Sequence, residues 1–230
     1  MRVSNVADPE RSKAQWYNLM RTLEEDVGAE LERMTPIEGL PDLVFTANAG
    51  LTHDGKTVIS RFRHPERQGE EEYFERWFTE HNYSVIPLEG ENYFEGAGDL
   101  LGFADTWFGG YRQRSDIAAY AALSEIYGKE ILPLELVNDK FYHLDTCFCP
   151  LSGGELLYYP SAFDSYAQDA ISNRIEEHRR LTVPQFEAER FACNAVCVDR
   201  HVVLPSDCGE TMDLLKHHGY TTHSVKLDEF

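Results

Sequence analysis

The chain has 230 residues, a length that suits one domain or one closed architecture built from smaller units. Its formal net charge of −19 argues against nucleic acid and anionic membranes as partners, because a phosphate backbone requires clustered Lys and Arg. No apolar run approaches the roughly 20 residues that cross a bilayer, and residues 1–8 lack the apolar core of a signal peptide, so we expect a cytoplasmic protein.

Amphipathic helices are predicted at regular intervals, each followed by a short strand. The first helix begins after Asp8, a good N-cap, with Pro9 at its first position, and Gly28 ends it. The predicted helices are Pro9–Val27, Pro65–Thr79, Ser115–Tyr127, Asp164–His178 and Cys208–His217. The strands predicted after them are Ala29–Met34, Ser84–Leu88, Glu130–Leu134, Leu181–Val183 and Thr222–Leu227, with two more at Leu43–Phe45 and Thr57–Ser60.

A polar residue recurs about every fifty residues, where a further strand starts after each helix and strand. These residues are Asn48, Glu95, His143 and Asn194. Such a spacing is typical of repeated supersecondary units, which must pack around a common axis to bury their apolar strands. We therefore predict that the strand starts meet in a central pocket, and that Asn48, Glu95, His143 and Asp145 share this one cavity. The fifth unit lacks its motif strand before Phe230, which favours a chain trimmed at both ends.

Three segments carry candidate chemistry. Glu95–Asp99 places glycines between two carboxylates, where they either admit a ligand close to the backbone or form an ordinary tight turn. His143–Asp145 would present an imidazole and a carboxylate on one face of a strand, and the carboxylate would then orient the imidazole. Pro41–Gly50 is an apolar strand that ends in small and polar residues, and a simple strand-to-turn transition explains it equally well.

Five cysteines in a chain without an export signal make a disulfide framework improbable. Cys147 and Cys149 alternate along one predicted strand, and Cys193 and Cys197 lie in a similar later segment. A four-cysteine zinc site would be conceivable, but both pairs lack the usual two-residue gap between ligands. We therefore predict mostly buried thiols, with neither disulfides nor a metal, and we expect no cofactor.

Taken together, the segments resemble the amidinotransferase and dimethylargininase superfamily of guanidine-modifying enzymes, most closely its arginine dihydrolase branch. The segments that carry the resemblance are Pro41–Gly50, Arg61–Arg67, Phe94–Asp99, Phe141–Thr146 and Cys193–Ala195. The resemblance implies one α/β domain over residues 1–230. Its fold would be a five-bladed α/β propeller of the pentein type, with helix-and-strand units around a pseudo-fivefold axis, incomplete here because the C-terminal catalytic strand is missing.

The resemblance also implies roles for single residues. Glu95 matches the carboxylate that grips the substrate guanidinium, His143 the general acid/base, and Asp145 the second catalytic carboxylate. Further substrate contacts are implied for Asn48, Phe45 and Asp99. Arg67 and Arg114 match positions that hold the substrate's carboxylate. None of the five cysteines matches the family's nucleophile, which is expected within about twenty residues beyond Phe230.

The chemistry agrees with these roles. A guanidinium is a planar cation that stays protonated at physiological pH, so its plane must be fixed by carboxylate or amide acceptors. A thiolate must then attack the central carbon, and a histidine must protonate the departing amine and later activate water. Glu95, Asn48 and His143 supply the acceptors and the acid/base, and only the thiolate is lacking.

We therefore predict hydrolysis of arginine at its guanidine carbon through a covalent thiouronium-type intermediate, giving ornithine, ammonia and carbon dioxide. Asn48 favours this reaction, because dimethylargininases usually have Asp at the matching position. The alternatives are a dimethylargininase that gives citrulline and an alkylamine, an amidinotransferase, and a catalytically dead arginine-binding homologue. The expected partner is a small cation, arginine or methylarginine, and a homo-oligomer is compatible with the sequence. Without a thiolate, residues 1–230 alone should be inactive.

Overall fold

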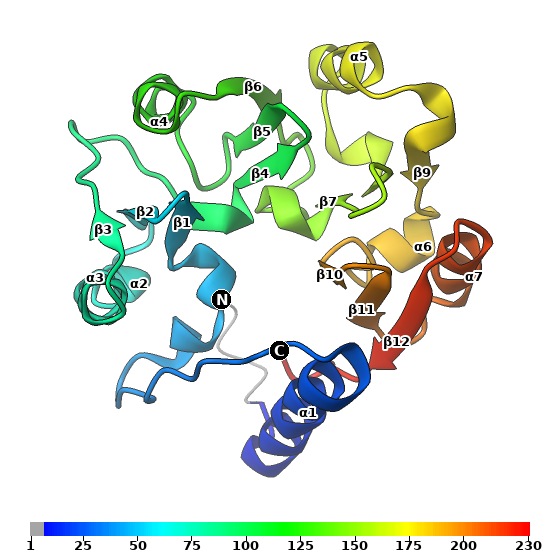
Figure 1. The fold of residues 1–230 in the computed structure, drawn as a ribbon, viewed down its shortest axis with the longest axis horizontal. Coiled ribbons are helices and arrows are strands. Elements are labelled where there is room, and N and C mark those ends of the chain that lie inside the picture. Colours follow the sequence, from blue (N-terminus) through cyan, green and yellow to red (C-terminus); the bar gives the residue numbers. More distant parts are fainter. Residues whose placement is uncertain (1–6) are drawn as a thin grey trace.

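A computed structural model describes residues 7–230 as a ring of four three-stranded sheets (Figure 1). In every sheet the first two strands form an antiparallel hairpin, and the third, reached through a helix, pairs parallel to the second. The unit that repeats is therefore ββαβ. The sheets consist of β1 (Gly50–His53), β2 (Lys56–Ile59) and β3 (Ser84–Val85); β4 (Leu100–Phe103), β5 (Thr106–Tyr111) and β6 (Glu130–Glu135); β7 (Phe148–Pro150), β8 (Leu156–Tyr158) and β9 (Arg180–Thr182); and β10 (Val196–Val198), β11 (His201–Pro205) and β12 (Thr221–Val225).

The helices that join the second and third strands lie on the outside of the ring, and the first strands lie nearest its centre (Figure 1). These outer helices are α2 (Pro65–Gln68) with α3 (Glu71–Glu80), α4 (Ala119–Tyr127), α5 (Ser165–Arg174) and α7 (Gly209–His217), while the short α6 (Gln185–Ala188) precedes β10. The predicted helices are thus confirmed, with ends that differ by a few residues.

The first helix follows its predicted signals. The carboxylate of Asp8 accepts hydrogen bonds from the first backbone N–H groups of α1 (Pro9–Arg21), a π-helical segment (Thr22–Val27) continues it, and Gly28 ends it in a left-handed conformation at φ 81°. Leu23 packs against Val203 and Val225 of the fourth sheet.

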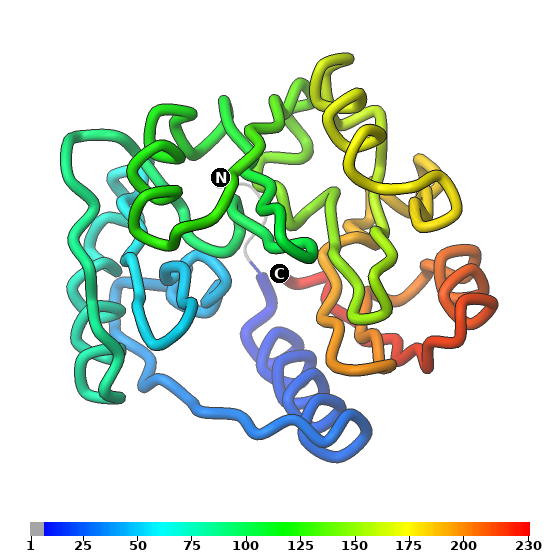
Figure 2. The backbone as a smooth tube through the Cα atoms, turned by 45° about the horizontal axis from the view of Figure 1, so that its top comes forward, coloured from blue at the N-terminus to red at the C-terminus, as the bar shows by residue number. Residues whose placement is uncertain are grey.

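The last residues of the chain lie beside α1, as Figure 2 shows. The side-chain oxygen of Gln15 accepts a hydrogen bond from the backbone N–H of Glu229 at 3.1 Å, and Arg11 pairs with Asp228 at 3.0 Å and with Glu229 at 2.7 Å. Four α/β units and α1 therefore surround the axis, in agreement with the predicted α/β propeller.

Three predicted strands are wrong. Within residues 7–230, Ala29–Met34 forms no strand, and at Leu43–Phe45 the chain ends a 3-10 helix (Pro41–Val44) with Phe45 as the residue after it. His143–Asp145 is not a strand either, because Leu144–Thr146 turns as a 3-10 helix before β7 begins. In the segment after Pro41, the N–H of Phe45 donates to the carbonyl of Asp42 at 3.0 Å, so local turns take up the backbone groups that a strand would pair with a neighbour.

The middle strands β5, β8 and β11 were not predicted. In β5, Gly109 and Gly110 weaken the strand pattern, yet both fit tightly packed places. A Cβ at Gly109 would lie 2.6 Å from the ring of Tyr120, and one at Gly110 would lie 2.8 Å from Cβ of Leu144. Between residues 7 and 230, no helix has the length and apolar composition needed to cross a membrane.

Candidate functional site

The repeated polar residues come just before the first strands of successive units. Asn48 precedes β1, Glu95 precedes β4, His143 precedes β7 and Asn194 precedes β10. Since these strands lie nearest the centre of the ring, their starts approach one another (Figure 1). The structure thus brings together residues that the fifty-residue repeat singled out.

Glu95 and His143 form the centre of the site. Nε2 of His143 lies 2.7 Å from Oε2 of Glu95, with Glu95 fully buried and His143 4% exposed. Oε1 of Glu95 accepts the backbone N–H of Arg63 at 3.1 Å, and Nη1 of Arg114 approaches Oε2 at 3.3 Å. Arg63 was not predicted, although it lies inside the segment Arg61–Arg67 that carried the family resemblance.

The two side chains stabilise each other's charged forms. Burial works to raise the pKa of Glu95, but the hydrogen bond and charge of His143 and the charge of Arg114 outweigh it, so the pKa is lowered. Burial works to lower the pKa of His143, but the carboxylates of Asp99, Glu95 and Asp145 outweigh it, so that pKa is raised. The carboxylate of Glu95 can therefore hold a cation, and the imidazolium of His143 can supply a proton.

Asn48 lies beside this pair. Its Nδ2 donates to the carbonyl of Glu95 at 3.2 Å and lies 3.5 Å from Nε2 of His143, while its Oδ1 accepts from Arg67 at 2.9 Å. The other nitrogens of Arg67 donate to Glu70 and to the carbonyl of Asp42, and the side chain is buried. Arg67 is therefore held by protein acceptors, and it positions Asn48.

Asp99 is likewise a buried support of the site. Its Oδ1 accepts the backbone N–H of Leu144 at 3.0 Å, and its Oδ2 accepts the hydroxyl of Ser115 at 2.7 Å, while that hydroxyl oxygen in turn accepts the N–H of Glu95. Burial raises the pKa of Asp99. Because protein donors occupy both oxygens, Asp99 links the segments that carry Glu95 and His143.

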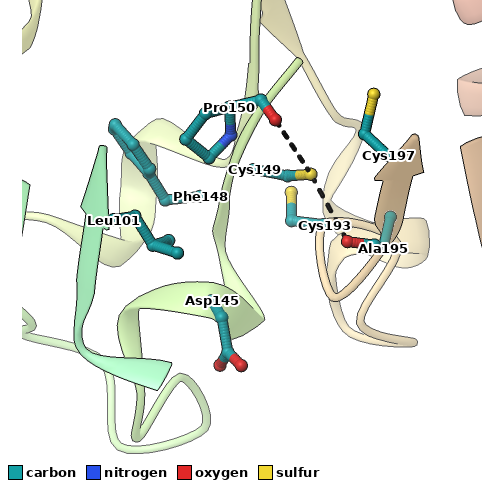
Figure 3. A pocket seen from close by; sticks show the side chains of 8 residues that line it. All are labelled: Leu101, Asp145, Phe148, Cys149, Pro150, Cys193, Ala195 and Cys197. Carbon is teal, nitrogen blue, oxygen red and sulfur yellow. Dashed lines mark hydrogen bonds between the residues drawn. The ribbon is translucent and has the colours of Figure 1, made fainter. Parts of the chain in front are cut away.

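Asp145 is among the residues that line a cavity of about 130 Å³. Figure 3 shows its carboxylate pointing away from Cys149 and Cys193, which also line this cavity. Of the four residues expected to share one central cavity, only Asp145 lines this one. Burial raises the pKa of Asp145 to about 7, and its Oδ1 has no hydrogen-bond partner within the described chain. Asn194 reaches across from the fourth unit and donates to the backbone carbonyl of Asp145 at 3.3 Å.

Two further residues predicted to contact the substrate, Phe45 and Arg114, are more exposed to solvent. Phe45 is 40% exposed between two 3-10 turns. Arg114 lies beside the pair, and its guanidinium carbon lies 5.0 Å from the ring centroid of Tyr142, a residue that the sequence had not singled out for a role. Such a distance allows a cation–π contact.

The thiols differ from an activated nucleophile. All five cysteines are free thiols, and four of them are buried, namely Cys147, Cys149, Cys193 and Cys208. Burial raises the pKa of each of these four thiols, to about 12 for Cys149 and about 11 for Cys208. A nucleophilic cysteine needs the opposite shift. Cys197 is half-buried, and its Sγ accepts the N–H of Ser152.

The carboxylate and the histidine that meet at the axis of this α/β propeller agree with the resemblance to the class of guanidine-modifying enzymes. The family described as N,N dimethylarginine dimethylhydrolase, eukaryotic, matches residues 3–204. The chain belongs to this family.

Two curated relatives illustrate how much of each protein the chain matches. It is 42% identical over 223 residues to the bifunctional arginine dihydrolase/ornithine cyclodeaminase ArgZ of Synechocystis, covering 96% of this chain and 31% of that protein. It is 34% identical over 229 residues to the N(G),N(G)-dimethylarginine dimethylaminohydrolase of Mycobacterium tuberculosis, covering 100% of this chain and 74% of that protein. The chain thus spans about a third of the length of the bifunctional relatives.

A solved structure agrees closely with the fold. The N-terminal domain of ArgZ, a cyanobacterial arginine dihydrolase, solved as a cysteine-to-serine variant bound to substrate, superposes with a TM-score of 0.96. The sequence identity is 41%, over 99% of this chain and 84% of that one. The pentein-type α/β fold expected from the sequence is therefore confirmed.

Raising the pH from 5 to 8 is expected to lower the free energy of unfolding. The pKa of Asp145 is about 7 in the folded chain and about 3.9 in an unfolded one. At pH values between these two pKa values, the folded state binds more protons than the unfolded state. The free energy of unfolding therefore falls as pH rises. His143 acts in the same direction, because the stability from its raised pKa is complete below about pH 6.5 and is lost as pH rises through the folded value.

Urea unfolding across this range checks the expectation. Asp145→Asn should remove part of the slope and be more stable than the parent at pH 8 by on the order of 2 kcal/mol. Asp169→Asn, at an exposed position of α5, should leave the slope unchanged. Parallel pH curves for Asp145→Asn and the parent would show that Asp145 is ionised in the folded chain throughout this range.

Proposed function

We propose that this chain carries the guanidinium-binding and acid/base groups of an enzyme that hydrolyses arginine at its guanidine carbon. The observation that carries the proposal is the buried contact of 2.7 Å between Glu95 and His143 at the ring axis. Glu95, held ionised, would grip the guanidinium. His143, held protonated, would give its proton to the departing nitrogen and then take one from the attacking water.

The reaction converts one arginine and two waters into ornithine, two ammonia molecules and carbon dioxide. A thiolate attacks the guanidine carbon, one nitrogen leaves as ammonia, and a first water releases citrulline from sulfur. The thiolate then attacks the ureido carbon of citrulline and expels the second ammonia, and a second water releases a carbamate of ornithine, which loses carbon dioxide to give ornithine. The buried cysteines of the chain have raised pKa values and do not suit this step. We therefore propose that the nucleophile is a cysteine outside residues 1–230, as the family resemblance implies, and that the protein acts in the cytoplasm.

Glu95→Gln is expected to weaken the binding of arginine by at least about thirtyfold, because a buried carboxylate that meets a guanidinium contributes strongly to affinity. Calorimetric titration of the chain with arginine measures this loss. The control is Glu130→Gln, an exposed carboxylate that pairs with Arg174 at 2.7 Å, and it should bind arginine as the parent does. Equal affinity in Glu95→Gln and Glu130→Gln would refute the proposed role of Glu95.

The products formed by the natural gene product separate the related reactions. Ornithine with two equivalents of ammonia supports the proposed dihydrolase. Citrulline with an alkylamine from methylated arginine would instead identify a dimethylargininase, and transfer of the amidino group to an amine would identify a transferase.

A further inference from the structure

The hydroxyl of Ser115 connects the two residues at the centre of the site. Its oxygen accepts the backbone N–H of Glu95 at 2.9 Å, and its proton goes to Oδ2 of Asp99 at 2.7 Å. The other oxygen of Asp99 accepts the backbone N–H of Leu144, the residue after His143, at 3.0 Å. One chain of hydrogen bonds therefore runs from the main chain of Glu95 to the main chain beside His143.

The sequence around Ser115 suggests a different role for this hydroxyl. A serine at the start of a helix usually caps it, and the helix predicted here begins with Ser115. In the structure α4 begins only at Ala119, and its N-cap residue, Ala118, makes no side-chain hydrogen bond to the helix. The fully buried hydroxyl of Ser115 serves the site instead of a helix end.

The neighbours of Ser115 fix where its hydroxyl lies. The carbonyl of Arg114 accepts from Nε of Arg63 at 2.8 Å. On the other side, the N–H of Asp116 donates to the carbonyl of Tyr93 at 2.9 Å, and Oδ2 of Asp116 accepts the N–H of Tyr93 at 2.9 Å. Because both flanking residues are anchored, Ser115 is held at a fixed distance from the segment that carries Glu95.

Asp99 is the charged group in the middle of this chain of hydrogen bonds. Burial raises the pKa of Asp99, and the hydrogen bond from Ser115 opposes that effect because it favours the carboxylate. Burial works to lower the pKa of His143, and the negative charge of Asp99 is the largest of the effects that raise it. The hydroxyl of Ser115 therefore acts on the charge that supports the imidazolium.

Other charged and titratable groups surround His143 and Asp99, namely Glu95, Asp145, Tyr120, Tyr142, Arg114 and Arg67. Replacing Ser115 with alanine changes none of these side chains. If the titration of His143 changes in that variant, the remaining question is whether the change passes through Asp99, and a variant of Asp99 answers it.

We propose that Ser115 is a positioning residue of the site: its hydroxyl keeps Asp99 a carboxylate, and that carboxylate keeps His143 protonated. The proposal rests on the proposed function of His143 as the group that supplies a proton. Without the hydroxyl, Oδ2 of Asp99 loses its donor, and a buried carboxyl group that loses a donor takes up a proton more readily. His143 then loses a neighbouring negative charge and releases its own proton at lower pH.

NMR titration of the imidazole of His143 tests this chain of effects. Ser115→Ala should lower the midpoint by about one pH unit or more, and Asp99→Asn should lower it at least as much. Ser115→Ala added to Asp99→Asn should shift the midpoint by less than about 0.3 of a unit further, because the charge is already absent. The matched control is Ser124→Ala, which removes a hydrogen bond of 2.6 Å to the carbonyl of Lys129 and should leave the midpoint unchanged.

The unsubstituted chain offers a second measurement, which does not depend on the folding of a variant. The NMR shift of Cγ of Asp99 should report a carboxylate over the pH range in which His143 loses its proton. A protonated Asp99 throughout this range overturns the proposal. An unchanged midpoint in folded Ser115→Ala overturns it too, as does a full further shift when Ser115→Ala is added to Asp99→Asn.

Ammonia release by the natural gene product separates this proposal from the proposed function. In Ser115→Ala, the fall of the rate with rising pH should move to lower pH by the same amount as the midpoint of His143. If the unsubstituted product released no ammonia from arginine, the proposed function would be overturned, whereas the NMR midpoints would still decide the role of Ser115.

Discussion

Replacing Gly98 with alanine is expected to destabilise the protein by about 2–4 kcal/mol and to abolish measurable binding of arginine. A Cβ at position 98 would lie 2.1 Å from Nδ2 of Asn48. Asn48 cannot retreat without cost, because Arg67 holds its Oδ1 at 2.9 Å and the carbonyl of Glu95 holds its Nδ2 at 3.2 Å. Either these buried hydrogen bonds break, or the turn that carries Glu95 moves away from His143.

Gly209→Ala is the matched control for this prediction. Gly209 begins α7, its φ is not positive, and no heavy atom lies within 4 Å of the Cβ that alanine would add. The change should alter stability by less than about 1 kcal/mol, in the stabilising direction, since alanine favours the helix. Urea unfolding and arginine titration of both variants test the pair. Equal behaviour of Gly98→Ala and Gly209→Ala would mean that the turn at Gly98 adapts freely and does not position Asn48.

The sequence predicted the order of the units because their signals are local. Helix α1 begins at a capping Asp8 and its π-helical extension ends at Gly28, and both features depend only on neighbouring residues. The convergence of Glu95 and His143 also followed from the sequence, since a fixed repeat places equivalent strand starts at the axis of the ring. The periodicity carried this prediction, and no single motif would have been sufficient.

The exact backbone at the site could not be predicted in the same way. Short apolar runs such as Leu43–Phe45 fit a strand or a turn equally well. Long-range packing decides between them: a Cβ at Gly96 would lie 2.9 Å from the backbone of Gly50, so the first two units meet with no room for side chains. His143 and Asp145 do not share the face of a strand, because Leu144–Thr146 turns as a 3-10 helix.

The sequence also could not show which groups the charged side chains contact. An arginine in a motif can serve a ligand or an internal carboxylate, and residue type does not distinguish the two. Arg67 pairs with buried Glu70 at 2.8 Å, whereas Arg114, forty-seven positions later in the same resemblance, remains at the edge of the site. Only the fold showed that Arg67 is buried among protein acceptors, whereas Arg114 is partly exposed.

Replacing His143 with glutamine is expected to lower kcat for arginine by a factor on the order of 10² to 10⁴, with KM changed by less than about fivefold. A glutamine amide can still donate to Oε2 of Glu95, which His143 contacts at 2.7 Å, so the guanidinium acceptor stays in place. An amide cannot carry a proton to the departing nitrogen or take one from water. The loss therefore falls on the chemical steps and not on binding.

The measurement uses the natural gene product, with ammonia release followed against pH. Because neighbouring carboxylates raise the pKa of His143, its imidazolium persists toward neutral pH, and the rate of the parent should fall as pH rises through that value. The residual rate of His143→Gln should lack this limb of the profile. His178→Gln, at an exposed position 73% open to solvent, should retain both the rate and the profile. If His143→Gln raised KM sharply and left kcat and the pH limb intact, His143 would hold the substrate without transferring protons, and the acid/base group would have to be sought elsewhere around Glu95.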